Sequence, residues 1–143
     1  MDTKRTIERM RLMTGLIALF VMGAVLVELF LLKHHEEWRQ ILPLVVIAIG
    51  ALLLTSQLVR PSSAGIVTLR ILMSVMIATG LLGVFFHYTG NLEFQMEMDP
   101  TQHGWALMRK ILEAKTPPAL APGALAQIGL LGLLYTYRHP SLD

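Results

Sequence analysis

Residues 41–59 read ILPLVVIAIGALLLTSQLV, a stretch of 19 residues without a charged side chain. A helix needs about 20 predominantly apolar residues to cross the roughly 30 Å hydrocarbon core of a bilayer. Pro43 lies in the first turn of this segment, where its missing N–H breaks no hydrogen bond within the helix. The segment therefore predicts a transmembrane helix.

Three further apolar stretches of similar length accompany it, at residues 12–32, 65–86 and 120–137. Helices satisfy their own backbone hydrogen bonds, which lipid cannot do, so we expect each stretch to be helical. The first two connections are short, and short connections favour antiparallel neighbours. The sequence thus predicts an all-α membrane protein, with four transmembrane helices in an antiparallel bundle that forms a single domain over residues 1–143.

The composition agrees with this fold class, because 54% of the residues are hydrophobic and only 15% are charged. Soluble domains carry about 25% charged residues. The formal net charge of +2 is too small to indicate a nucleic-acid partner. Cysteine is absent, which excludes disulfides, thiolate metal ligands and cysteine nucleophiles.

Basic residues near the membrane predict which side each end of the chain occupies, because lysine and arginine accumulate on the cytoplasmic side. We assign both termini and the second connection to the cytoplasm and place the protein in the inner, or plasma, membrane of a bacterium. The side assigned to the cytoplasm carries Lys4, Arg5, Arg9, Arg11, Arg60, Arg70 and Arg138. The opposite side carries fewer basic residues, which are Lys33, Arg39, Arg109, Lys110 and Lys115.

The connection at residues 87–119 is the only sizeable segment expected outside the membrane. Asp99 followed by Pro100 is typical of a helix start, with Asp99 as the N-cap. Trp105, Met108 and Ile111 then recur at helical spacing, which predicts an outer amphipathic helix. Two interpretations stay open: the helix lies on the membrane surface, or it packs as a cap on the outer end of the bundle.

Two ionisable residues fall inside predicted spans. Glu28 lies near the outer end of the first span, where we expect a polar pair with Gln127 or, alternatively, a role as ligand or proton acceptor. Arg70 lies near the inner end of the third span, where we expect its side chain to extend to the lipid phosphates.

Small residues on the fourth span predict a helix-packing face made of Gly123, Ala126, Gly129 and Gly132. Helices associate in lipid through close packing, which small side chains permit. This face could serve the chain's own bundle or a partner subunit, and the sequence does not separate the two.

Histidines and carboxylates collect on the predicted outer side of the membrane. Imidazole and carboxylate groups are the metal ligands that remain when cysteine is absent, and two histidines can also hold a haem. The simpler interpretation is that these are interfacial residues in a solvated loop. The candidate ligands for a metal ion or haem are Glu28, His34, His35, His87, Glu93, Glu97 and His103.

The C-terminal part of the chain contains HYTGNLEFQMEMDP at residues 87–100, LAPG at 120–123 and YTYRHP at 135–140. In these segments the chain resembles small four-helix inner-membrane proteins of bacteria. The resemblance implies the membrane architecture and brings no activity, cofactor or site residue with it.

Three functional hypotheses follow. The first is a non-enzymatic accessory or assembly subunit of a larger bacterial membrane complex, bound to a membrane-protein partner or to copies of itself. It is favoured by short connections, small-residue faces and the lack of conventional catalytic motifs. The second is an outer-face metal- or haem-binding protein in redox chemistry or metal handling, and the third is a small oligomeric transporter or channel.

Overall fold

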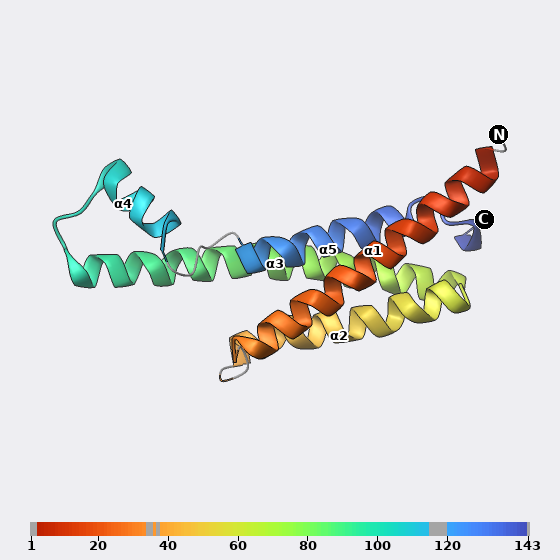
Figure 1. Cartoon of the computed structure of the whole chain (residues 1–143), viewed down its shortest axis with the longest axis horizontal. Coiled ribbons are helices and arrows are strands. Elements are labelled where there is room, and N and C mark those ends of the chain that lie inside the picture. Colours follow the sequence, from red (N-terminus) through yellow and green to blue (C-terminus); the bar gives the residue numbers. More distant parts are fainter. Residues whose placement is uncertain (1–2, 34–35, 37, 115–119, 143) are drawn as a thin grey trace.

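A computed structural model describes residues 3–33, 36, 38–114 and 120–142, and the regular elements within them are all helical (Figure 1). These described residues form five α-helices and one short 3-10 turn, which are α1 (Thr3–Leu31), α2 (Trp38–Val59), α3 (Ser63–Met98), α4 (Gly104–Leu112), α5 (Leu120–Thr136) and η1 (Pro140–Leu142).

Three of these helices, α1, α2 and α3, are long and apolar enough to cross a membrane. Helix α5 is also apolar but has only 17 residues, which gives it a length of about 25 Å at 1.5 Å per residue. The all-α class and the long apolar helices expected from the sequence are therefore confirmed. The fourth apolar segment is a shorter helix than the other three.

The four apolar helices pack in a ring. On one side of the ring α5 lies between α1 and α3, and on the other side α2 contacts both α1 and α3. Helix α5 makes its most extensive contact with α3. Fully buried side chains, including Met22, Ile47, Met73 and Ile128, come from each of the four helices and form one core. Large apolar side chains such as Phe20 and Leu52 point outward instead, as expected of helices that face lipid.

Helix α3 differs from the prediction because it does not end at Phe86 but continues to Met98. The boundary at residue 86 was predicted from the loss of apolar residues, which marks the end of a membrane span. A helix can continue past that point wherever its residues favour the helical conformation. Residues 92–98 include good helix formers such as Glu93, Gln95 and Glu97. No proline interrupts the sequence between Ser63 and Pro100. The extension carries α3 beyond the other long helices at the end of the bundle that lies opposite the two ends of the chain (Figure 1). We call this end the outer end and the opposite one the inner end.

The predicted role of Asp99 was also wrong, because Asp99 caps the end of α3 and does not begin α4. Pro100 disfavours a helical conformation at the preceding residue, and Asp99 is extended with φ −154° and ψ 93°. Helix α4 starts five residues later, at Gly104, whose φ of +64° favours glycine.

Helix α4 folds back along the extension of α3, and among the described elements it contacts only α3. Ile111 is buried against this extension, and Asn91 donates a hydrogen bond to the carbonyl oxygen of Ile111 at 3.3 Å. Helix α4 is therefore not the cap on the bundle that we considered. It forms a projecting hairpin with residues 87–98 of α3, hereafter the outer hairpin.

Glycines allow the backbones of α3 and α5 to approach closely. A Cβ atom added at Gly129 would lie 2.6 Å from the carbonyl oxygen of Met73, and one added at Gly132 would overlap the Met73 side chain. Gly80 on α3 lies against Ala126 in the same way, whereas a Cβ at Gly123 would meet no atom within 4 Å. Three of the four predicted small residues thus face α3 of the same chain, and Gly123 does not.

These contacts predict opposite outcomes for two glycine-to-alanine substitutions in α5. Gly129→Ala should lower the free energy of unfolding by about 1–3 kcal/mol, because the added methyl group meets backbone that cannot move aside. Gly123→Ala should leave it within about 0.5 kcal/mol or raise it slightly, since alanine favours helix. Unfolding in mixed micelles, followed by circular dichroism, measures both; equal effects would contradict the assigned packing.

Candidate functional site

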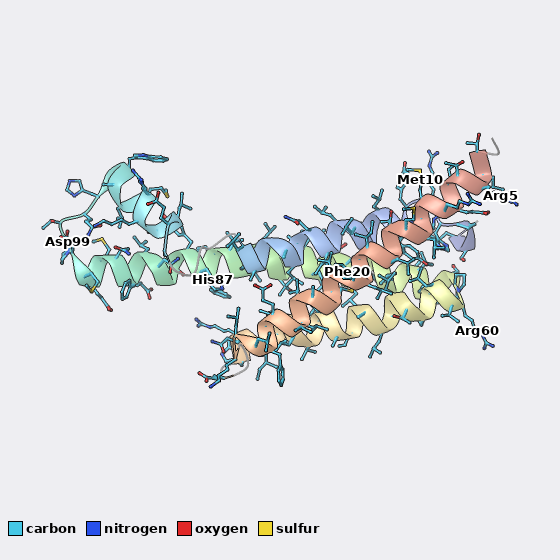
Figure 2. The ribbon with its side chains drawn as sticks, viewed as in Figure 1. Arg5, Met10, Phe20, Arg60, His87 and Asp99 are labelled. Carbon is cyan, nitrogen blue, oxygen red and sulfur yellow. The ribbon has the colours of Figure 1, made fainter. Side chains whose placement is uncertain are left out.

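A cavity of about 330 Å³ lies between the outer ends of α1, α2, α3 and α5. It forms where α1 and α2 splay away from α3 and α5 toward the outer end of the bundle (Figure 1). We call it the outer cavity. Figure 2 shows His87 on the side of α3 that faces the ends of α1 and α2, where it lines this cavity.

The inner wall of the outer cavity is largely apolar. Val25 and Leu29 contribute from α1, Ile47 from α2 and Leu125 from α5. Thr79 is a polar residue of this wall and is buried. Such a wall suits an apolar group, because few polar atoms there would have to give up water on binding.

The rim of the cavity is polar and carries positive charge. Arg39 lies at the start of α2, and its guanidinium carbon is 5.1 Å from the centre of the Phe86 ring and 5.6 Å from that of Trp38. These cation–π contacts hold the guanidinium beside the opening. His87, Gln40 and Asn91 complete the polar rim, and no aspartate or glutamate is among the lining residues that the structure describes.

The turn of the outer hairpin is held by the carboxylate of Asp99. This carboxylate accepts hydrogen bonds from the Thr101 hydroxyl at 2.6 Å, the Thr101 N–H at 3.1 Å and the Gln102 side chain at 3.0 Å. These hydrogen bonds, led by that from the Thr101 hydroxyl, hold the pKa of Asp99 below its ordinary value. The turn is thus fixed in the ionised state of Asp99.

Large apolar side chains on the outer hairpin are left exposed by the part of the chain that the structure describes. Phe94 is 59% exposed, Met98 is 70% exposed and Trp105 is 76% exposed. The acidic residues Glu93, Glu97 and Asp99 are sequence neighbours of Phe94 and Met98 at the end of α3. The α3 side of the hairpin therefore presents apolar groups beside a concentration of negative charge, whereas α4 carries the basic residues Arg109 and Lys110.

At the opposite end of the bundle, two arginines hold the C-terminus of α5. Arg70 donates a hydrogen bond to the carbonyl oxygen of Thr136 at 2.6 Å, and Arg11 donates one to that of Arg138 at 2.9 Å. Cations at a helix C-terminus also interact favourably with the helix dipole. Arg70 is thus a capping residue, and its side chain does not extend to the lipid phosphates as the sequence led us to expect.

The candidate metal or haem ligands that the structure describes do not come together. Glu28 is exposed on α1, His87 lines the outer cavity, and Glu93, Glu97 and His103 are exposed on the outer hairpin. No group of three or more histidine, aspartate or glutamate residues within the described part of the chain could hold a metal ion. His34 and His35 lie outside the described residues, so their involvement stays a prediction.

The expected polar pair of Glu28 and Gln127 is not formed by a hydrogen bond in the described structure. Both side chains are exposed. Contacts such as that of Gly15 with Tyr135 place antiparallel α1 and α5 in a register that sets Glu28 nearer the level of Pro122 than of Gln127. Glu28 instead borders a shallow groove on the face of α1 that is turned away from the bundle, and Phe20, Gly23 and Ala24 also line this groove.

Sequence reasoning missed Arg39, Gln40 and Asn91 as a group. Two predicted spans, at residues 41–59 and 65–86, separate Arg39 from Asn91 along the sequence, so only the packing of α2 against α3 brings them to one rim. A signal was nonetheless available, because Arg39 follows Trp38 at the outer start of the second apolar segment, the level at which His87 ends the third.

Comparisons of the chain with protein-family models, curated proteins and solved structures found no significant match.

His139, at the inner end of the bundle, should make the stability of the protein depend on pH. Nδ1 of His139 accepts a hydrogen bond from the N–H of Ser141 at 3.2 Å, which requires the unprotonated nitrogen. Burial lowers the pKa of His139 from its ordinary value of 6.5, and Arg11 and Arg70 lower it further. The contribution of neutral His139 is therefore complete above pH 6.5 and is lost as the pH falls from there through the lowered pKa.

Chemical unfolding of the protein in micelles between about pH 8 and pH 5 tests this dependence. We expect the wild type to lose stability toward the acid end and His139→Gln to lose less, because glutamine does not titrate. Parallel curves for the two proteins would show that His139 does not contribute.

Proposed function

We propose that the protein is a four-span inner-membrane protein of bacteria that acts as a non-enzymatic subunit of a larger membrane complex. The observation that carries this proposal is the outer hairpin, which exposes large apolar side chains at a distance from the membrane that lipid does not reach.

The distance follows from the continuity of α3. If the hydrocarbon core ends near Phe86, the helix rises about 16 Å between His87 and Met98 at 1.5 Å per residue. The headgroup layer adds only about 5–8 Å to each side of the hydrocarbon core. Met98, and Trp105 on the returning helix, therefore lie beyond the headgroups. A surface of this kind outside lipid is typical of a protein–protein interface.

The charge on the α3 side of the hairpin favours a different protein as the partner over a second copy that presents the same side. Residues 93–99 contain three acidic side chains and no basic one, so two such segments placed face to face would repel each other. We infer a partner surface that is apolar with basic residues at its edge. Such a surface would complement Phe94 and Met98 together with Glu93 and Glu97.

The fourth span and the orientation belong to the same proposal. Helix α5 is short for a lone span, and its close packing along α3 favours insertion beside a helix that is long enough. Arg5 and Arg60 lie at the same end of the bundle as both ends of the chain, while Asp99 lies at the far end (Figure 2). The positive end is accordingly placed in the cytoplasm.

A photo-crosslinking amino acid introduced in place of Trp105 tests the proposed interface in intact cells. We expect one discrete adduct with another membrane protein. The matched control is the same amino acid in place of Leu52, which is equally exposed but lies in the middle of α2. This position should label lipid.

The variants Phe94→Ala and Trp105→Ala should each weaken the complex by about 2 kcal/mol, since exposed aromatic groups often dominate such interfaces. Size measurement in a mild detergent would show the loss of the partner. Adducts at position 105 with lipid alone, or with a second copy alone, would overturn the proposed partner.

A further inference from the structure

We propose that the outer cavity binds a single-chain amphiphile with an anionic head group, with the chain against the apolar wall and the head beside Arg39. This inference uses the membrane orientation of the proposed function, but it does not depend on the proposed complex, because the cavity and the exposed apolar side chains of the hairpin are different surfaces.

The size and lining of the cavity favour one apolar chain. Its volume of about 330 Å³ lies at the small end of the roughly 300–1,000 Å³ found for ligand sites. A two-chain phospholipid would not be enclosed in it. Val25, Leu29, Ile47 and Leu125 provide an apolar wall from three different helices, so the chain would be surrounded and not merely adsorbed.

The charge at the rim favours an anionic head. Arg39 and His87 are the ionisable residues among those that line the cavity, and Arg39 forms no hydrogen bond or ion pair within the described part of the chain. Its guanidinium instead makes cation–π contacts with the Phe86 and Trp38 rings. A carboxylate or phosphate would give this positioned cation the charge-assisted hydrogen bonds that an uncharged head cannot give.

The position of the rim agrees with the same ligand. Trp38 and Arg39 begin α2 at the outer end of the bundle, the level of the lipid headgroups in the proposed orientation. An amphiphile that enters from the outer leaflet would therefore keep its head at headgroup depth while its chain moves sideways into the cavity. Fatty acids and lipids with one acyl chain and a phosphate head share this chemistry.

A glycine at the rim offers a way to close the cavity without disturbing the fold. Gly90 lines the cavity, is exposed, and has no atom within 4 Å of the position that a Cβ would take. Gly90→Leu should therefore fill space at the opening and favour the helix. The matched control is Gly23→Leu, because Gly23 also has open space around it but lies on the outer groove of α1.

The experiment uses the full chain in nanodiscs of phosphatidylcholine. The probe added to them is dodecanoate with a photoreactive diazirine on its acyl chain. Mass spectrometry maps the adducts after illumination. We expect labelling concentrated at Val25, Leu29 and Leu125, displaced by unlabelled dodecanoate or dodecyl phosphate and much less by dodecanol. The stronger of the two anionic competitors identifies the head group as carboxylate or phosphate.

The variants separate the site from general partition into lipid. Gly90→Leu should abolish cavity labelling, Arg39→Gln should weaken it about tenfold, and Gly23→Leu should leave it unchanged. Circular dichroism verifies that each variant is folded. If Gly90→Leu does not fold, the labelling of Arg39→Gln tests the proposal by itself. Equal labelling of the outward-facing Phe20 and Leu52, or equal competition by dodecanol, would overturn the proposal.

Discussion

The close approach of α3 and α5 is the contact on which the rest of this structure depends. In lipid there is no hydrophobic driving force between helices, so van der Waals packing and hydrogen bonds hold them together. Gly80, Gly129 and Gly132 allow backbone to lie against backbone or against the Met73 side chain. This contact gives the short helix α5 a long neighbour. It also places Thr136 beside Arg70 and Pro122 beside Gly83, at the two ends of the interface.

The two ends of the bundle are built in different ways. At the inner end, hydrogen bonds from Arg11, Arg70 and Tyr135 tie the end of α5 to α1, α3 and α2. At the outer end, α1 and α2 diverge from α3 and α5, and the space between them is the outer cavity. A bundle fixed at one end and open at the other can accept a ligand at the open end without losing the contacts that define the fold.

Hydropathy was sufficient to find the four apolar helices, because an apolar run of the right length is a strong and local signal. It failed at α3, where residues 87–98 lose their apolar character but keep their helical propensity. The capping pattern failed at Asp99, because the same residue type caps the turn after a helix as readily as the start of the next one. The sequence placed Arg39 and His87 at one level of the membrane, but their meeting with Asn91 at one rim depends on the relative rotation of two helices, which hydropathy does not give.

Asn91 connects the two outer features of the molecule. Asn91 lines the cavity and also donates its hydrogen bond to the Ile111 carbonyl of α4. A protein that displaces α4 must either break this hydrogen bond or move Asn91 at the cavity rim. By thermodynamic reciprocity, any change that a partner makes in the affinity of the cavity is matched by an equal change that the cavity's occupant makes in the affinity for the partner. The hydrogen bond of 3.3 Å thus connects the rim of the cavity to α4 through a single side chain.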